Sequence, residues 1–188
     1  MFENLVTSFL IDEVVGGFFI SVPPGHVACL YDRGRGVLPK MWGPGLHLKI
    51  PFWQIAKLFN AQTLEYTISQ DFDVEEAKES LGDEPIIATT KDERTIQLEG
   101  TVLLRLRKES ASLIWENIGE NVVSKMVRPA ARSRIRSVVS NFTADEVTTT
   151  RRDEVEEQIR NELIKVLDDR GIIIERMLLS DVKVINRI

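Results

Sequence analysis

The sequence is poor in the residues on which enzyme chemistry most often depends. Its 188 residues include one cysteine and two histidines. A single cysteine, Cys29, excludes an internal disulfide framework, and its place in an alternating segment favours a small buried side chain and a reducing compartment. The sequence contains no G-x-S-x-G elbow, phosphate-binding glycine loop or dinucleotide fingerprint. We therefore predict that the chain is not an enzyme and needs no metal or other cofactor.

His26, His47 and Cys29 are the remaining candidates for chemistry, because residues distant in sequence can converge in a fold. Together they would supply a nucleophile and a base, or ligands for zinc. Each histidine lies beside turn glycines, however, and no acid stands at ligand spacing. We favour histidines that hydrogen-bond turns or face lipid headgroups over either chemical alternative.

A long uninterrupted hydrophobic run is also missing. Residues 1–20 are rich in Leu, Val, Phe and Ile, but Glu3, Asp12 and Glu13 interrupt them. Each carboxylate in mid-span costs about 2.5–3.5 kcal/mol, so the segment is not predicted to span a membrane. Its apolar stripe instead favours shallow membrane contact, with packing on the protein's own sheet or on a neighbouring subunit as alternatives. The predicted contact residues here are Leu5, Val6, Phe9, Leu10, Phe18 and Phe19.

The net charge of −5 is small but unevenly distributed. Basic residues predominate between Pro24 and Lys57, and acidic residues predominate between Asp71 and Glu99. We predict that the basic segment contacts phospholipid headgroups, each nearby cation contributing about 1 kcal/mol. Solvated loop charge is the alternative. The predicted headgroup contacts are Arg33, Arg35, Lys40 and Lys49.

Hydrophobic residues make up 43% of the chain, which is enough for a substantial core. The first half reads as short strands, of which 27–31 and 46–50 are expected to be half-buried. The strict alternation over 95–107 predicts a strand with one face on a core, and 86–90 is expected to pair with it as a hairpin. Gly100 interrupts that alternation, which indicates a bulge or a close backbone approach.

After residue 108 the period becomes helical. We expect helices over 110–118, 121–141 and 151–170, a capping box at Thr143–Glu146 and a final strand from Ile172. Strands followed by helices and a strand indicate an α+β fold with a mixed, mainly antiparallel sheet and packed helices. The expected organisation is a membrane-proximal segment (1–21) and two contiguous subdomains, one β-rich (22–107) and one helix-rich (108–188).

One predicted helix carries a cationic stripe at i, i+3, i+7 and i+11: Lys125, Arg128, Arg132 and Arg136. Nucleic acid, an acidic partner and a solvated face are all possible readings of such a stripe. Interleaved aromatic residues are missing, so nucleic acid is disfavoured. We predict a subunit interface in which this stripe meets the acidic 71–84 segment of a neighbouring copy.

Several motifs occur in a characteristic order. A Pro24-Gly25 strand start is followed by Gly43-Pro44-Gly45-Leu46-His47 and Pro51-Phe52. Trp115–Glu120, Val127–Pro129, Thr143–Val147 and Leu167–Ile172 follow in the second half. This order resembles the stomatin/prohibitin/flotillin (band 7) superfamily, and the prohibitin branch most closely. The resemblance covers roughly residues 22–184.

The resemblance implies a non-catalytic, membrane-associated scaffold that forms a homo-oligomeric ring or cage and organises a membrane microdomain. It also implies regulation of a membrane-bound AAA protease, and a bacterial inner membrane or an organelle membrane such as the mitochondrial inner membrane. No small-molecule substrate or nucleic acid is expected. Prohibitins usually have an N-terminal anchor and a C-terminal coiled coil, so we expect this chain to be a fragment that lacks the latter. The alternative is a soluble protein-interaction module without membrane affinity.

Overall fold

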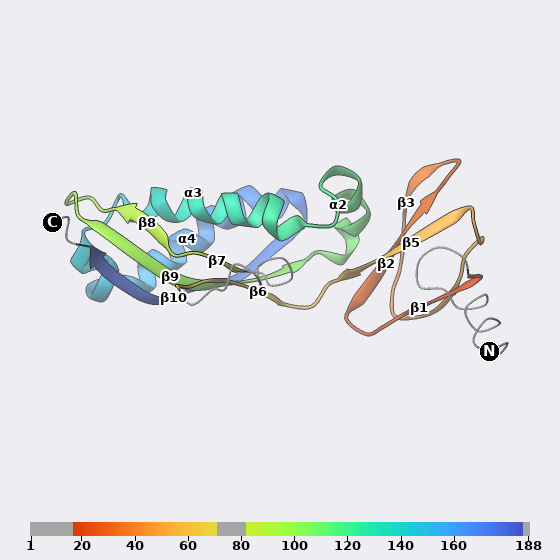
Figure 1. The fold of residues 1–188 in the computed structure, drawn as a ribbon, viewed down its shortest axis with the longest axis horizontal. Coiled ribbons are helices and arrows are strands. Elements are labelled where there is room, and N and C mark those ends of the chain that lie inside the picture. The colour runs from red at the N-terminus through yellow and green to blue at the C-terminus, as the bar shows by residue number, and fades with distance from the viewer. Residues whose placement is uncertain (1–16, 71–81, 186–188) are drawn as a thin grey trace. The chain divides into compact units, whose positions relative to one another are not determined.

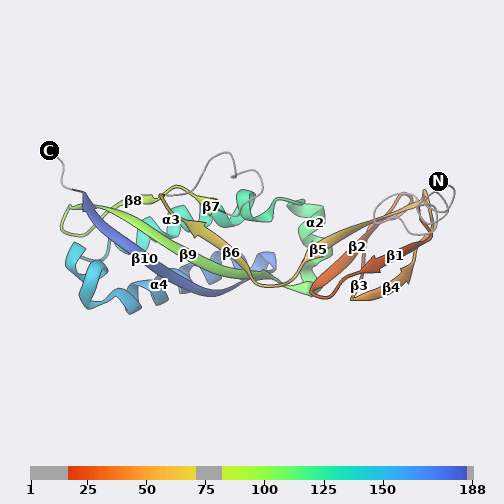
Figure 2. The ribbon, with the colours of Figure 1, turned by 60° about the horizontal axis from the view of Figure 1, so that its bottom comes forward.

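The computed structural model describes residues 17–70 and 82–185, and these form two compact units. The first unit takes Leu106–Glu120 together with the described part of Met1–Gln62, and the second takes the remaining described residues. Figures 1 and 2 show the elements of each unit. The α+β class and the mainly antiparallel pairing predicted from sequence are confirmed.

The first unit is built from five strands and one short helix. They are β1 (Phe19–Val22), β2 (His26–Asp32), β3 (Gly36–Trp42), β4 (Gly45–Leu48), β5 (Gln54–Asn60) and α2 (Ala111–Asn117), which follows a 3-10 turn, η2 (Lys108–Ser110). Strands β3, β2 and β5 form an antiparallel sheet in that order, and β1 pairs with β4 as a separate ribbon. The core between them contains Ile20, Val22, Ala28 and Ala56.

The second unit is a sheet covered by helices. Its strands are β6 (Leu64–Ile68), β7 (Gly82–Asp83), β8 (Ile86–Thr89), β9 (Thr95–Leu106) and β10 (Ile172–Ile185). Its helical elements are η3 (Val123–Val127), α3 (Arg128–Val139), η4 (Glu146–Thr150), α4 (Arg152–Leu167) and η5 (Asp168–Arg170). The sheet order is β10-β9-β6-β7, with β8 also paired to β9, and α3 packs beside β8 while α4 packs beside β10 (Figure 1).

Strand β9 is the centre of this sheet and follows the predicted alternation. Every second residue from Ile96 to Leu106 is buried, and β8 pairs with its first half as the expected hairpin. The sequence also predicted a close approach at Gly100. A Cβ atom there would lie 2.5 Å from the carbonyl oxygen of Leu178 on β10. Only glycine therefore allows the two strands to lie this close together.

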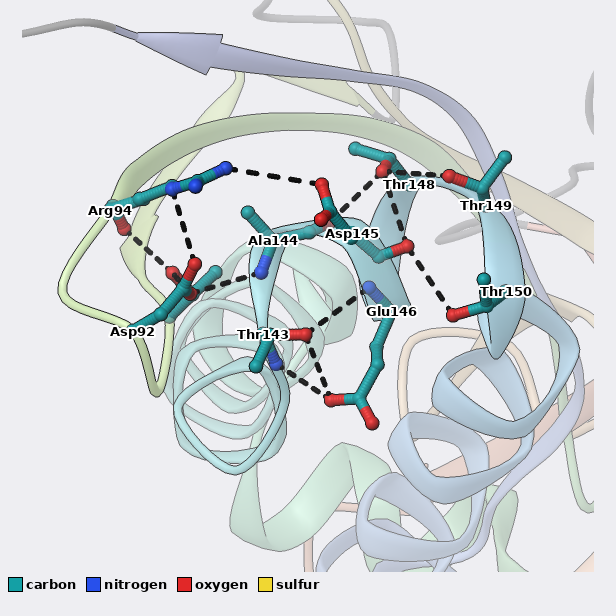
Figure 3. Close-up of polar contacts among 10 residues, drawn as sticks. Asp92, Arg94, Thr143, Ala144, Asp145, Glu146, Thr148, Thr149 and Thr150 are labelled. Carbon is teal, nitrogen blue, oxygen red and sulfur yellow. Dashed lines mark hydrogen bonds and ion pairs between the residues drawn. The ribbon is translucent and has the colours of Figure 1, made fainter.

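The predicted capping box lies just before η4, between α3 and α4, and it joins the tip of the β8–β9 hairpin (Figure 3). The Thr143 amide donates to Glu146 Oε2 over 2.8 Å, and the Glu146 amide donates to Thr143 Oγ1 over 3.4 Å. Asp92, on the β8–β9 turn, accepts the amide of Ala144 over 3.0 Å. A local cap and one long-range bond therefore fix the chain where η4 starts.

The division into units differs from the single boundary expected between residues 107 and 108. The chain passes between units at 62/63, 105/106 and 120/121, so neither unit is contiguous. Hydrophobic alternation identifies a strand but does not indicate which core receives its buried side chains. The three-part proposal (1–21, 22–107 and 108–188) rests on the sequence alone.

Candidate membrane-contact and subunit-contact surfaces

The β1–β4 ribbon turns an apolar face away from its core. Phe19 pairs with Leu48, and Ile20 pairs with His47. Ile20 is fully buried, whereas Leu46 and Leu48, on the opposite parity, are 65% and 64% exposed. Because successive side chains of a strand point to opposite faces, the ribbon has one face in the core and one apolar face without cover.

The turn after β4 extends this exposed surface. Ile50, Phe52 and Trp53 are 54%, 62% and 51% exposed. Phe52 has a φ of 61°, a left-handed conformation that is uncommon for a bulky residue and that often occurs at functional sites. We define the apolar patch as the exposed residues of the ribbon and this turn: Phe18, Leu46, Leu48, Ile50, Phe52 and Trp53.

A buried carboxylate connects the apolar turn to the basic turn Arg33–Arg35. Asp32 is 2% exposed and accepts hydrogen bonds from Arg35 (2.8 Å), Gln54 Nε2 (3.1 Å) and the Gly34 amide (3.0 Å). The Arg35 bond, followed by that of Gln54, holds the pKa of Asp32 below its usual range. Gln54 in turn accepts the Ile50 amide, so this network fixes the basic turn beside the apolar turn.

The predicted membrane contacts have mixed positions. Leu5, Val6, Phe9 and Leu10 lie outside the described residues. Phe18 is 39% exposed, Phe19 is half-buried, and Arg33, Arg35 and Lys40 are exposed. Lys49 differs from the expectation, because it is only 2% exposed. The two-residue period that turns Leu46 and Leu48 outward turns Lys49 inward.

Sequence reasoning missed the main part of the patch. The alternation Leu46-x-Leu48-x-Ile50 was expected to place its apolar parity on a core, and the structure places that parity on the surface. The sequence does contain a signal: the apolar parity continues to Phe52, and Trp53 follows directly, so that the apolar residues extend beyond one short strand.

The predicted cationic stripe lies on η3 and α3 of the second unit. Arg128 donates to Asp83 Oδ1, and Arg132 Nε lies 3.1 Å from Asp83 Oδ2. Asp83 is 1% exposed and also accepts the Tyr66 hydroxyl over 3.0 Å. Burial raises the pKa of Asp83, but the bonds from Arg128 and Tyr66 outweigh that effect and hold the pKa below its usual range.

The other two cations of the stripe, Lys125 and Arg136, are exposed, and Arg136 Nε donates to the carbonyl of Ile87 over 3.0 Å. One acid of the predicted 71–84 partner, Asp83, is therefore used within the chain. Residues 71–81 lie outside the described residues. The stripe as a subunit interface stays a prediction.

The chemical candidates are separated. Cys29 is fully buried, and burial raises the pKa of its thiol. His26 contacts the carbonyl of Pro24 over 3.2 Å, and His47 contacts that of Gly43 over 2.7 Å. Over residues 17–70 and 82–185, no acid, cysteine and histidine side chains gather as a metal site. Within the same ranges, no helix has the length and apolar character needed to cross a membrane.

The described residues thus form a mixed α+β fold in which one ribbon of the first unit leaves an apolar face uncovered. Residues 20–187 match the model of the SPFH domain / Band 7 family, and the chain belongs to this family. The predicted superfamily is thereby confirmed.

The chain is similar to several prohibitins. It is 29% identical to the mitochondrial Prohibitin-4 of Arabidopsis thaliana over 77% of this chain and 46% of that protein. It is 25% identical to Prohibitin 1 of Mus musculus over 89% of this chain and 55% of that protein. Prohibitin-1 of Schizosaccharomyces pombe is 27% identical over 82% and 49%. The chain therefore spans about half the length of these relatives, and the similarity agrees with the prohibitin branch.

Proposed function

We propose that this chain forms a non-catalytic, membrane-associated scaffold. The observation that carries the proposal is the apolar patch, where exposed large side chains lie beside the basic turn Arg33–Arg35. Monomeric proteins rarely expose such contiguous apolar surface. Band 7 proteins are generally non-enzymatic scaffolds, which supports the same proposal.

A membrane surface matches both parts of this site. Large apolar side chains contribute about 1.5–3 kcal/mol each when they are fully removed from water, so partial insertion of a few of them suffices for binding. Arg33, Arg35 and Lys40 would add about 1 kcal/mol each when they lie near anionic headgroups. The turn Ile50–Trp53 would enter the interface, and the arginines would remain among the phosphates.

Assembly is the second part of the proposal. We propose that copies of the chain self-associate laterally through the α3 surface that contains Lys125, Arg128, Arg132 and Arg136, and that a ring or cage results. A membrane microdomain, restraint of an AAA protease, and a bacterial or mitochondrial inner membrane are finer parts of this proposal. They rest on the family resemblance, although some relatives are named as mitochondrial.

Vesicle co-sedimentation tests membrane contact. The variant Leu48→Ser/Trp53→Ser should bind vesicles of neutral and anionic phospholipid at least about tenfold more weakly than the natural chain, because two inserted side chains are lost. Leu113→Ser is the matched control, since Leu113 is 60% exposed in the same unit but lies on α2. Arg33→Glu should reduce binding to anionic vesicles only, and high salt should remove this difference.

Failure of the natural chain to bind either vesicle would overturn the membrane proposal and favour the soluble interaction module. Equal losses in Leu48→Ser/Trp53→Ser and Leu113→Ser would retain membrane binding but move it away from the apolar patch. Binding that disappears only on deletion of residues 1–17 would assign the contact to that segment.

A further inference from the structure

We propose that two surfaces of the second unit, on opposite sides of its sheet, dock head to tail between copies of this chain. This inference rests on the self-association proposed above and names the surfaces that make it. The β8 surface consists of Ile87 and Arg136. The β10 groove consists of Asp153, Glu157 and Leu178, with the side chains that line the same hollow.

Exposed apolar side chains identify both surfaces. In the described part of the second unit, every large hydrophobic residue that is well exposed lies on β8 or β10. Ile87, on β8, is 54% exposed, and Leu178, on β10, is 41% exposed; Val184 and Ile185 continue the β10 set. The central strand β9 has no such residue, so the uncovered apolar area lies at two separate margins of the sheet.

The two surfaces differ in their unpaired charges. Arg136 donates to the backbone carbonyl of Ile87, and no carboxylate pairs with it among the described residues, although Glu84 lines the same shallow hollow as Ile87. The β10 groove is lined by four acids and two arginines: Asp153, Glu156, Glu157, Arg160, Glu175 and Arg176, with Met177 and Leu178.

Internal contacts use part of the groove. Glu156 accepts the Leu179 amide over 2.9 Å, and Glu175 pairs with Arg105 at 3.0 Å. Asp153 and Glu157, one turn apart on α4, have no cationic partner within the described parts of the chain. These two acids therefore provide the counter-charge that Arg136 of a second copy lacks in its own chain.

Side chains of α4 engage the backbone of β10 between Glu175 and Ser180, which disfavours an added strand there. Arg160 donates to the carbonyl of Glu175 over 2.9 Å, and Arg152 donates to those of Leu179 and Ser180. These side chains satisfy the backbone groups that a new strand would need. Docking at the groove is therefore a contact between side chains, with Ile87 against Leu178 and Arg136 against the two acids.

Strands β8 and β10, which carry the two surfaces, both pair with β9 and lie on opposite sides of it (Figures 1 and 2). A copy that uses its β8 surface on one neighbour keeps its groove for another. Such a head-to-tail contact does not end at a dimer, and it closes into a ring when the rotation between copies permits. The position of Arg136 at the end of the cationic stripe also fits, because Arg128 and Arg132 are engaged by Asp83.

Mixing two variants tests this arrangement. Ile87→Asp removes one surface and Leu178→Asp removes the other, so each should weaken self-association at least about tenfold in sedimentation velocity. A mixture of the two should form a 1:1 complex that grows no further, because one intact β8 surface meets one intact groove. Leu113→Asp, on an equally exposed apolar residue outside both surfaces, should assemble like the natural chain.

Charge reversal gives a second test with variants that leave the sheet unchanged. Arg136→Glu and Glu157→Arg should each weaken association several-fold at low salt, and the double variant should recover it. Reversal of Arg170, which is exposed outside both surfaces, is the control. Assembly of the natural chain that none of these variants alters would overturn the inference but leave the scaffold proposal standing. A natural chain that is monomeric both in solution and on vesicles would overturn self-association itself.

Discussion

The two units differ in how far they expose their apolar side chains. In the second unit, β9 buries every second residue, and within residues 63–70, 82–105 and 121–185 the well-exposed large apolar side chains lie on β8 and β10. In the first unit, the ribbon exposes Leu46 and Leu48 while it buries the neighbouring Lys49. A lone exposed leucine needs no explanation, but a contiguous patch of large residues does. The second unit therefore leaves apolar side chains exposed only along β8 and β10 among its described residues, whereas the first unit exposes a larger apolar patch, which fits the membrane contact proposed above.

The buried carboxylates of the two units also differ, in how far away in sequence their arginine partners lie. Asp32 of the first unit holds a local turn, with Arg35 only three residues away. Asp83 of the second unit contacts Arg128 across 45 residues of sequence, and it joins β7 to α3. Removal of Asp83 should therefore disturb tertiary packing, whereas removal of Asp32 should chiefly disturb the presentation of the apolar patch.

The largest effect is expected from Asp83→Asn. The substitution leaves Arg128 and Arg132 without their buried counter-charge, and we expect the free energy of unfolding to fall by about 2–4 kcal/mol. Urea denaturation measures this change. Asp145→Asn is the control, because its side chain is 85% exposed and pairs with Arg94 only at 3.9 Å, so it should change stability by less than about 0.5 kcal/mol. Equal effects of the two substitutions would remove the distinction drawn between buried and surface pairs.

Acid should destabilise the natural chain more than it destabilises the Asp83→Asn variant. The folded-state pKa of Asp83 lies below its unfolded value, so its contribution is fully present above about pH 4 and is lost as the pH falls further. The natural chain should consequently lose more stability between pH 5 and pH 3 than the Asp83→Asn variant. Parallel pH profiles of the two proteins would contradict the assignment.

Gly100→Ala is expected to have the next largest effect. Its Cβ would meet the Leu178 carbonyl at 2.5 Å, and because that atom belongs to the backbone, β9 and the neighbouring edge strand β10 must move apart. We expect a loss of about 2–3 kcal/mol in the free energy of unfolding. Gly43→Ala in the first unit meets no atom within 4 Å and is the control, with an expected loss of less than about 1 kcal/mol. A tolerated Gly100→Ala would mean that β9 and β10 separate easily.

Much of the second unit was predictable from sequence because its signals are local. Alternation identified β9, the interrupted parity marked Gly100, the Thr143–Glu146 spacing marked the capping box, and Gly171 ends the last helix with a φ of 78°. The capping box and the helix end depend on neighbours within a few residues, and alternation alone identifies a strand. The close approach at Gly100 involves Leu178 of the distant strand β10, but the break in alternation that marks it is local.

The candidate surfaces were less predictable because they depend on what lies opposite each side chain. Alternation showed that Leu46 and Leu48 share a face, but the absence of cover over that face is a tertiary property. The helical spacing placed Arg128 and Arg132 on one stripe, whereas their engagement by Asp83 depends on a strand distant in sequence. The family resemblance identified the kind of protein without locating either surface.

A smaller effect is expected from Thr143→Ala, which removes the hydroxyl of the capping box (Figure 3). We expect a loss of about 1 kcal/mol in the free energy of unfolding, because the cap lies at one end of the helical layer. Thr149→Ala is the control, since its hydroxyl contacts only that of Thr148. A loss from Thr143→Ala as large as that from Asp83→Asn would show that local caps, rather than long-range pairs, hold the second unit together.

The smallest change in stability, and the sharpest test of the comparison, is expected from Phe52→Gly. Glycine adopts the left-handed φ of 61° without the Cβ penalty but has more freedom in the unfolded chain, so these effects nearly offset and stability should change by less than about 1 kcal/mol. Vesicle binding should nevertheless weaken by about three- to tenfold, because the lost ring is 62% exposed and contributes to the membrane rather than to the core. Glu93→Gly makes the same backbone change at a φ of 60° in the second unit and should leave vesicle binding unaltered. A Phe52→Gly variant that unfolds easily and binds vesicles normally would mean that the Phe52 side chain stabilises the first unit and does not contact the membrane.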